Sequence, residues 1–212
     1  MNPEFWHKRW AERQIGFDQP RPNPLLLKHF NSLNLELGSR IFVPLTGKTI
    51  DAAWLLSEGF QVVGVELNET AVKELFEELS AEPEISKTEN FRIYSADNIN
   101  IFVGDFFKLS AEMVEKVDAV YDRAALVALP KEMRKDYCTH LRNITKKAPQ
   151  FLIVFEYDQG LVSGPPFSIT QEEIHQHYGA SYSVQLLESV EMPGGLKGQV
   201  KANENIWTLV TK

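Results

Sequence analysis

The chain lacks the features of a secreted or membrane-bound protein. It contains one cysteine, Cys138, in 212 residues, so no disulfide can form within the chain. Its longest strongly apolar run, FLIVF at 151–155, is far shorter than the ~20 residues that span a bilayer. The N-terminal residues form no apolar signal core. We therefore expect a cytoplasmic protein without a membrane partner.

Positive charge is also scarce. The 22 Lys and Arg residues are outnumbered by 29 Asp and Glu residues, which leaves a net charge of −7. A protein dedicated to nucleic acid usually presents a basic face, so we expect no nucleic-acid partner. A chain of this length suits one domain with a sizeable core. We expect a single domain over 1–212, a monomer that handles small molecules.

Segments typical of strands and of helices alternate from residue 40 onward. Strands are predicted at 40–45, 61–67, 99–107, 117–122 and 150–158, and helices at 3–14, 25–33, 49–59, 68–80, 131–147 and 169–179. Residues 81–95 are polar and predict an insertion, and the last 30 residues predict a hairpin. This alternation is typical of an α/β fold with a mostly parallel sheet and helices on both faces. By analogy of element order, we expect a Rossmann-like sheet of seven strands, as in class I methyltransferases, with a C-terminal antiparallel hairpin.

The first strand is followed by Gly47, Lys48 and Thr49, which match the end of a phosphate-binding P-loop. That motif needs another glycine five positions before Gly47, but Phe42 stands there, inside the predicted strand. The turn is also too short to wrap a triphosphate. A P-loop phosphotransferase is therefore the disfavoured alternative.

An acidic residue suggests a different ligand. Glu66 ends the second predicted strand, 19 residues after Gly47. At about this spacing, dinucleotide-binding folds place the carboxylate that holds the ribose hydroxyls. Because the turn has one glycine rather than three, it predicts a ribose site without a pyrophosphate, which fits S-adenosylmethionine. The alternative is that Glu66 is a solvated residue at a strand end.

Two further strand ends carry candidate residues. Asp105 and Phe106 lie at the carboxyl end of the third predicted strand, where adenine lies in such folds, although an aspartate in a turn also serves local capping. Arg123 ends the fourth strand, at the ligand crevice. It is predicted to bind a carboxylate of the cofactor or the substrate. The alternative is an ion pair with Asp122 or with a helix residue.

The N-terminal residues 1–24 combine aromatic residues with a proline-rich stretch. Trp6, Trp10 and Phe17 precede or adjoin this stretch and predict a movable aromatic lid, with a simple apolar pad as the alternative. Cys138 is expected in the core. His175 and His177 point to different faces of a helix, so no metal site is predicted.

Four stretches together resemble the bacterial branch of the thiopurine S-methyltransferase family, over nearly the whole chain. They are FWHKRWAERQIGF, VPLTGKTIDAAWLLSEGFQVVGVE, YDRAALVALP and EYDQGLVSGPPF. The resemblance implies S-adenosylmethionine-dependent methylation of sulfur in aromatic and heterocyclic thiols, with selenium and tellurium compounds as further candidates. The predicted cofactor-binding residues are Trp10, Leu45, Gly47, Glu66, Asp105, Phe106 and Arg123, and the predicted substrate-binding residues are Trp6, Phe17 and Arg123.

The chain departs from the family pattern in two places. Thr46 stands where many members have cysteine, and no arginine follows Arg142, although animal members carry one near the last hairpin. The expected reaction is an in-line attack of a thiolate or selenolate on the sulfonium methyl. It requires no strong general base, and no catalytic residue is predicted. Asp122 is a candidate for a base, and the alternative is that it orients Arg123. A non-catalytic S-adenosylmethionine sensor is the second alternative.

Overall fold

The computed structural model describes residues 3–212, so the first two residues of the predicted domain and lid lie outside the described residues. The strands are β1 (Arg40–Pro44), β2 (Gln61–Glu66), β3 (Glu84–Lys87), β4 (Arg92–Ala96), β5 (Ile99–Val103), β6 (Ala119–Arg123), β7 (Gln150–Tyr157), β8 (Tyr182–Glu191) and β9 (Ala202–Thr211). The helices are α1 (Pro3–Ala11), α2 (Pro24–His29), α3 (Ile50–Ser57), α4 (Glu69–Glu78), α5 (Ala111–Val114), α6 (Lys131–Ile144) and α7 (Gln171–Tyr178). Three short 3₁₀ helices complete the described elements: η1 (Phe30–Leu33), η2 (Phe106–Lys108) and η3 (Leu126–Ala128).

All of these strands join one sheet in the order β3-β4-β5-β2-β1-β6-β7-β9-β8. The central strands from β5 to β7 are parallel, and the strands at both edges pair antiparallel. The α/β class, the helical layers and the C-terminal hairpin are confirmed. The expected number of seven strands is wrong, because the sheet of the described chain has nine.

The two additional strands arise from the segment 81–95, which the sequence predicted to be an insertion. It contains β3 and most of β4, which pair as an antiparallel hairpin. All four residues of β3 are exposed, so the strand has no buried face. A strand without a buried face shows no alternation of apolar and polar residues, and backbone pairing alone places it in the sheet.

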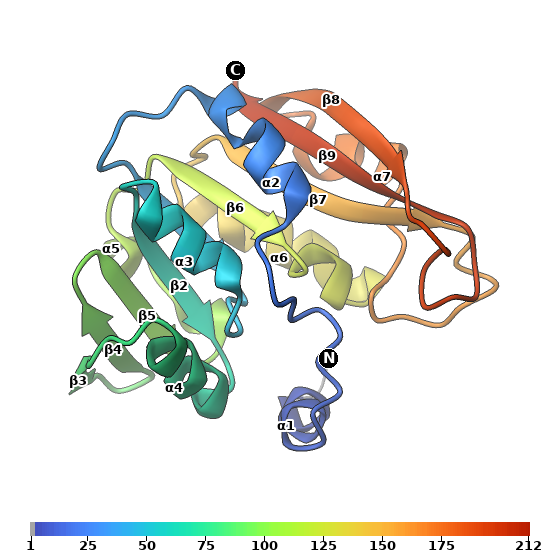
Figure 1. The fold of residues 1–212 in the computed structure, drawn as a ribbon. Coiled ribbons are helices and arrows are strands. Elements are labelled where there is room, and N and C mark those ends of the chain that lie inside the picture. The colour runs from blue at the N-terminus through green and yellow to red at the C-terminus, as the bar shows by residue number, and fades with distance from the viewer. Residues whose placement is uncertain (1–2) are drawn as a thin grey trace.

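Helices cover both faces of the sheet (Figure 1). The side chains of α2, α3 and α4 pack on one face, and those of α5, α6 and α7 on the other. Alternate side chains of strand β1 pack against the two opposite helical layers. Ile41 and Val43 join the cluster under α3, whereas Phe42 joins the cluster under α6. Cys138 is buried in this second cluster, as expected.

The strand order places a crevice at one end of the sheet. From β1 the chain continues to β2 on one side, and β6 later pairs with β1 on the other side. At such a switch point the loops after the two strands diverge and leave a ligand crevice at the carboxyl ends. Figure 1 shows α1 apart from the helical layers, connected to α2 by an extended segment.

A close approach inside the sheet restricts Gly64 of β2. A Cβ atom on Gly64 would lie 2.2 Å from Thr46 Oγ1 and 2.8 Å from Ile101 Cδ1. Thr46 cannot easily move, because its hydroxyl donates to the Val43 carbonyl at 2.8 Å. The position therefore accepts no side chain without a shift of the turn after β1.

We predict that Gly64→Ala destabilises the fold by roughly 1–3 kcal/mol, the usual cost of overpacking. Urea unfolding would measure this loss as a lower midpoint. Gly16→Ala is the matched control, because a Cβ there meets no atom within 4 Å, and its effect should stay within about 0.5 kcal/mol. Equal midpoints for the two variants would contradict the prediction.

Candidate active site

A cavity of about 320 Å³ lies at the carboxyl ends of the parallel strands, and we call it the first cavity. The turns after β1, β2, β5 and β6 form its floor, and the N-terminal segment forms its roof. The structure brings together around this cavity all of the predicted site residues: Trp6, Trp10, Phe17, Leu45, Gly47, Glu66, Asp105, Phe106 and Arg123.

The turn after β1 has an unusual backbone. Leu45 has a φ of 46° and Gly47 a φ of 58°, both in the left-handed region. Leucine rarely adopts this conformation, and such residues concentrate at functional sites. Glycine also suits position 47 because a Cβ there would lie 3.3 Å from Trp10 Cζ2, so that a larger residue would require a small shift of the Trp10 ring. The turn therefore presents its backbone directly to the cavity.

Glu66 ties this turn to the next one. Its Oε2 accepts from the Gly47 N–H at 2.7 Å, and its Oε1 accepts from the Asn68 N–H at 2.8 Å. Its residue exposure is 7%, so the alternative of a solvated strand end is wrong. Burial raises its pKa, although the hydrogen bonds from Asn68 and Gly47 oppose the rise. Each carboxylate oxygen keeps acceptor capacity for a hydroxyl in the cavity.

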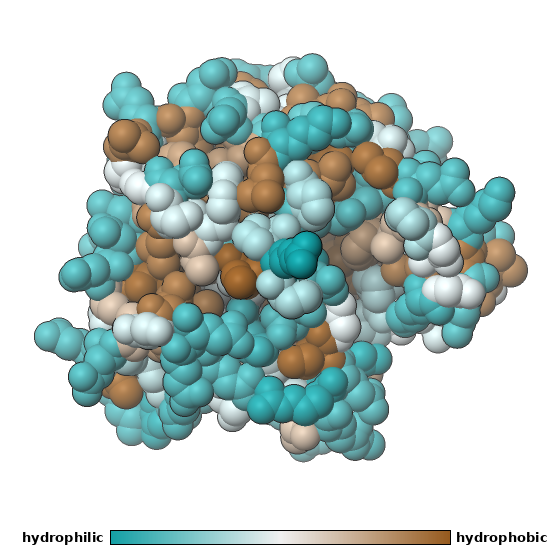
Figure 2. All heavy atoms as spheres, in the orientation of Figure 1, coloured by the Kyte–Doolittle hydropathy of each residue, from teal (hydrophilic) through white to brown (hydrophobic). Residues whose placement is uncertain are grey.

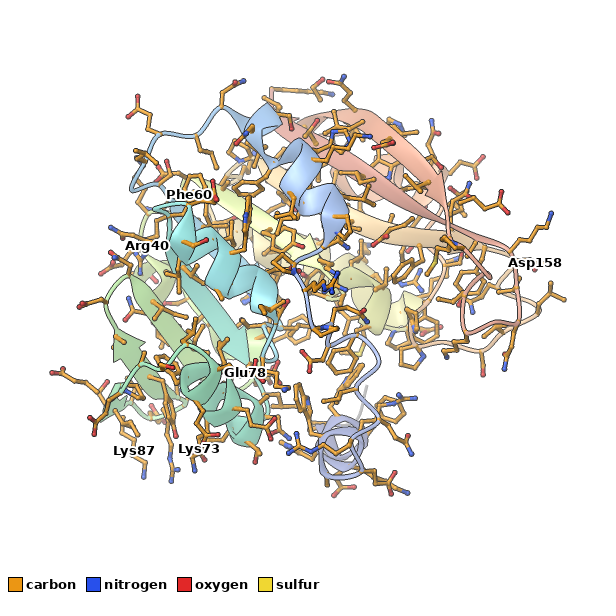
Figure 3. The ribbon with its side chains drawn as sticks, viewed as in Figure 1. Arg40, Phe60, Lys73, Glu78, Lys87 and Asp158 are labelled. Carbon is orange, nitrogen blue, oxygen red and sulfur yellow. The ribbon has the colours of Figure 1, made fainter. Side chains whose placement is uncertain are left out.

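Lys48 does not behave as a P-loop lysine. Its Nζ lies 2.6 Å from Glu78, 3.2 Å from Asp18 and 3.6 Å from Glu74, and the hydrogen bond to Glu78 is the main cause of its raised pKa. Figure 3 shows Glu78 at the end of α4, on the side of the N-terminal segment. Arg13 pairs with Glu74 at 2.7 Å in the same cluster. The lysine thus serves to hold the N-terminal segment against α4.

Arg123 pairs with a helix residue, which was one of its expected alternatives. Its Nη1 lies 3.3 Å from Oδ2 of Asp51 in α3. Asp51 is fully buried and also accepts from Tyr121 Oη at 2.8 Å and the Asn23 N–H at 2.7 Å. The Arg123 Nε is buried and has no hydrogen-bond partner among residues 3–212. An unpaired buried donor is costly, so this nitrogen is suited to bind an acceptor on a ligand.

Asp122 has a different role from the one expected. It accepts from Tyr137 Oη at 2.8 Å and from the Leu126 N–H at 3.1 Å, and it lines neither cavity described here. Burial raises its pKa to about 6. The expectation that Asp122 orients Arg123 is wrong, because Asp51 does so. Asp122 instead holds the loop that begins at Ala124, whose φ of 63° is left-handed.

Of the residues predicted to lie near adenine, one caps its own turn, while their neighbour Phe107 faces the cavity. Asp105 Oδ1 accepts from the Phe107 N–H at 3.0 Å, so its capping alternative is confirmed. Phe106 is buried against Tyr137 and His140, with ring centroids 5.0 and 4.9 Å away. Phe107, which the sequence reasoning missed, lines the cavity and is 38% exposed.

The aromatic residues of the N-terminal segment cover the cavity. Trp10 is buried, and its ring lies 5.6 Å from that of Phe17. Trp6 contacts the same Phe17 ring at 6.0 Å. His7 reaches Asn68 at 3.3 Å and links α1 to the start of α4. These contacts place three aromatic rings between solvent and the turn that follows β1.

A larger cavity of about 860 Å³ adjoins the first, and we call it the second cavity. The two share the wall residues Trp6, Phe17, Arg123, Ala124 and Ala128. Apolar side chains of β7 and the β8–β9 connection form much of its wall: Ile153, Phe155, Met192 and Leu196. Figure 2 shows apolar atoms in a hollow on this face, beside the loops at the end of the hairpin.

The sequence reasoning missed this second cavity. Its charged wall residues are Arg9, Arg21, Arg123, Lys197 and Glu204, from segments far apart in the chain. No local pattern joins these residues, since the pairing of β7 with β9 and the path of the N-terminal segment bring them together. The motif GPPF was noted in the sequence only as part of the family resemblance, and its residues Pro165 and Pro166 line the second cavity.

Solved structures define the class of protein to which the fold belongs. The 1,6-didemethyltoxoflavin-N1-methyltransferase of Burkholderia thailandensis, solved with S-adenosylhomocysteine, aligns with a TM-score of 0.64 and 14% identity over 98% of this chain and 86% of its own. An S-adenosylmethionine-dependent methyltransferase of Anabaena variabilis aligns with a TM-score of 0.64 and 15% identity over 99% and 96%. The fold is that of the Rossmann-like, S-adenosylmethionine-dependent methyltransferases.

Comparison of the sequence with known families identifies one family within this class. The chain belongs to the thiopurine S-methyltransferase family, whose family model matches residues 1–211. It is 51% identical over 210 residues to the thiopurine S-methyltransferase of Xanthobacter autotrophicus, with 99% of both chains covered. It is 46% identical over 216 residues to that of Acinetobacter baylyi, with 100% of both covered. The predicted resemblance is confirmed. Among residues 3–212, no helix is long and apolar enough to cross a membrane.

We predict that Glu66→Gln weakens the binding of S-adenosylhomocysteine by roughly 10- to 100-fold, as expected when a charged hydrogen-bonding partner is lost. A glutamine has one acceptor oxygen, so its NH₂ group would face a backbone N–H. Calorimetry on the folded variant measures the loss. Glu69→Gln is the control, because Glu69 pairs with Arg92 and Tyr94 outside the first cavity. Unchanged affinity in Glu66→Gln would contradict the prediction.

We predict that Asp122 makes stability fall between about pH 4 and pH 6. Its pKa in the folded protein, about 6, lies above the ordinary 3.8. The contribution of the protonated Asp122 to the free energy of unfolding is therefore full below pH 4 and is lost as the pH rises through 6. The loss amounts to about 3 kcal/mol at most. Asp122→Asn lacks this titration, so its stability relative to the unmodified protein should improve from pH 4 to pH 7. Urea unfolding at both values would show a constant difference if the prediction is wrong.

Proposed function

We propose that this chain transfers the methyl group of S-adenosylmethionine to the sulfur of an aromatic or heterocyclic thiol. One observation carries the proposal: two adjoining cavities meet at Arg123 and Ala124. Both have largely apolar walls, but the first contains the buried Glu66 carboxylate and the left-handed turn after β1, whereas the second, larger cavity contains neither. A polar cofactor and a flat, apolar acceptor would each find the surroundings that suit them.

The residues of the first cavity fit the cofactor. The Glu66 carboxylate would receive the ribose hydroxyls, and the turn containing Leu45 and Gly47 would border the amino-acid part. Phe106 and Phe107 would lie near adenine, with Asp105 at the edge. The unpaired Nε of Arg123 suits a carboxylate, of the cofactor or of an acidic substrate. The cofactor supplies a methyl group on a positively charged sulfur, which a nucleophile can displace.

The second cavity would hold the acceptor. Its apolar walls, such as Ile153 and Phe155, favour an aromatic ring, and its volume of about 860 Å³ accommodates a heterocycle. An aromatic selenol of the same shape would fit equally. The chain would act by positioning the sulfur against the methyl carbon, an effect worth up to ~7–11 kcal/mol in favourable cases. A sensor that only binds the cofactor would have no use for this second cavity.

The N-terminal segment would act as the lid. Trp6, Trp10 and Phe17 cover the boundary of the two cavities, and Asp18 and Arg13 hold the segment to Lys48 and Glu74. The Arg13 side chain is largely exposed, so its ion pair with Glu74 is of modest strength, whereas the Lys48–Asp18 pair is more buried and would have to separate when the segment opens for exchange of ligands. In the closed form the three rings would keep water from the methyl group.

We predict that the purified protein converts thiophenol and heterocyclic thiols to their S-methyl products, with one S-adenosylhomocysteine formed for each. Mass spectrometry of the products and a coupled assay for S-adenosylhomocysteine measure this reaction. Aliphatic thiols of similar size are the control acceptors and should react more slowly, because they fill the apolar cavity less well. Binding of S-adenosylmethionine without methylation of any aromatic thiol or selenol would contradict the proposal and favour the sensor.

A further inference from the structure

Glu204 is a carboxylate in the wall of the otherwise cationic and apolar second cavity. It lies on β9, opposite Phe155 of β7 and Val190 of β8, and is partly buried. Among the described residues that line this cavity it is the one acid, beside Arg9, Arg21, Arg123 and Lys197. A partly buried carboxylate in an acceptor site requires an explanation, since burial disfavours its charge.

A chain of hydrogen bonds positions Glu204 relative to Arg123. Glu204 Oε1 accepts from Asn23 Nδ2 at 3.0 Å, and the Asn23 N–H donates to Asp51 Oδ1 at 2.7 Å. Asp51 Oδ2 in turn pairs with Arg123 Nη1 at 3.3 Å. Asn23 and Asp51 are both buried, so the chain is shielded from solvent. It holds a carboxylate and a guanidinium on the wall of one cavity.

The one hydrogen bond to the Glu204 side chain among the described residues uses Oε1. The remaining acceptor sites of the carboxylate are therefore available to a ligand in the second cavity. The burial of Glu204 raises its pKa, and the hydrogen bond from Asn23 opposes the rise. A carboxylate with a raised pKa is a better proton acceptor than one in water.

The other acids near the reaction site do not line the second cavity. In the first cavity, Asp18 pairs with Lys48, Glu66 accepts from two backbone N–H groups, and Asp105 caps η2. Asp122 lines neither cavity. Glu204 is thus the carboxylate that faces the acceptor's side.

The chemistry of heterocyclic thiols creates a need for such a group. When a ring nitrogen adjoins the carbon that bears sulfur, the molecule exists in water largely as a thione with an N–H group. Methylation of its sulfur leaves a proton on that nitrogen, and a neutral product forms only when the proton departs. A carbocyclic thiol, by contrast, ionises to a thiolate before it binds and has no such proton.

We propose that Glu204 accepts the ring N–H of a heterocyclic thione and takes up its proton as the sulfur is methylated. The inference rests on the proposed function and names its substrate class. The S–CH₃ bond forms as the methyl carbon leaves the sulfonium sulfur. The N–H bond breaks, its electron pair returns to the ring, and an O–H bond forms on Glu204. The proton then passes to solvent when the product leaves.

The test compares two acceptors of similar size, pyridine-2-thione, which carries the N–H group, and thiophenol, which does not. Glu204→Gln should lower kcat/KM for pyridine-2-thione by about 100-fold, a usual contribution of proton transfer to a positioned side chain. The value for thiophenol should change by less than about threefold, because its thiolate needs no proton acceptor. The glutamine oxygen can still accept from Asn23, so the hydrogen-bond chain is preserved.

Glu156→Gln is the matched control. Glu156 lies on β7, and its carboxylate also accepts from an asparagine side chain, with Oε2 2.7 Å from Asn205 Nδ2, but it does not line the second cavity. This variant should leave the ratio of the two kcat/KM values unchanged. Should Glu204→Gln fail to fold, Glu204→Asp keeps a carboxylate at a shorter reach and should show a smaller loss for pyridine-2-thione alone.

Two results would overturn the role of Glu204 while leaving the proposed function intact. One is an equal loss for both acceptors, which would indicate a structural role, and the other is no loss for either. If the unmodified protein methylates neither acceptor nor any other aromatic thiol, the proposed function itself fails. The comparison of acceptors therefore separates the two failures.

Discussion

The buried carboxylate of Asp51 is the interaction on which the geometry of the site depends. A carboxylate without solvent is tolerated only when donors surround it, and Asp51 has three: the Asn23 N–H, Tyr121 Oη and Arg123 Nη1. They come from the N-terminal segment and from β6, while Asp51 itself lies in the first turn of α3. One side chain thus sets where the lid segment leaves the sheet and where Arg123 points.

The site has two parts with different structural origins. The first cavity lies at the ends of parallel strands, where Glu66 links the turn after β1 to the turn after β2. The second cavity depends on the antiparallel extension of the sheet by β9 and on the segment before α2. Arg123 and Ala124 stand between the two cavities. A left-handed residue follows β1 and β6 alike, so strained backbone adjoins the cavity at both sides of the switch point.

The sequence predicted the parallel part of the fold and the first cavity well, for a physical reason. Leu45, Glu66, Asp105 and Arg123 each lie at or just after the end of a predicted strand. Because the carboxyl ends of parallel strands meet at one edge, identifying the strands is enough to bring these residues together. The prediction was wrong where that logic is missing. The exposed strand β3 shows no apolar face, and Asp122, expected to orient Arg123, instead accepts hydrogen bonds from Tyr137 and Leu126.

The amino-acid pattern by itself determined the α/β class, the positions of the buried strands along the chain, the unusual turn at Gly47 and membership of the family. These features rest on local periodicity, on single glycines and on motifs of contiguous residues. Only the tertiary structure decided which groups are buried, which are paired, and that Glu204 shares a cavity wall with Arg123. Hydrogen bonds such as that between Asn23 and Glu204, which are 181 positions apart, depend on how the chain folds back and leave no trace in local sequence.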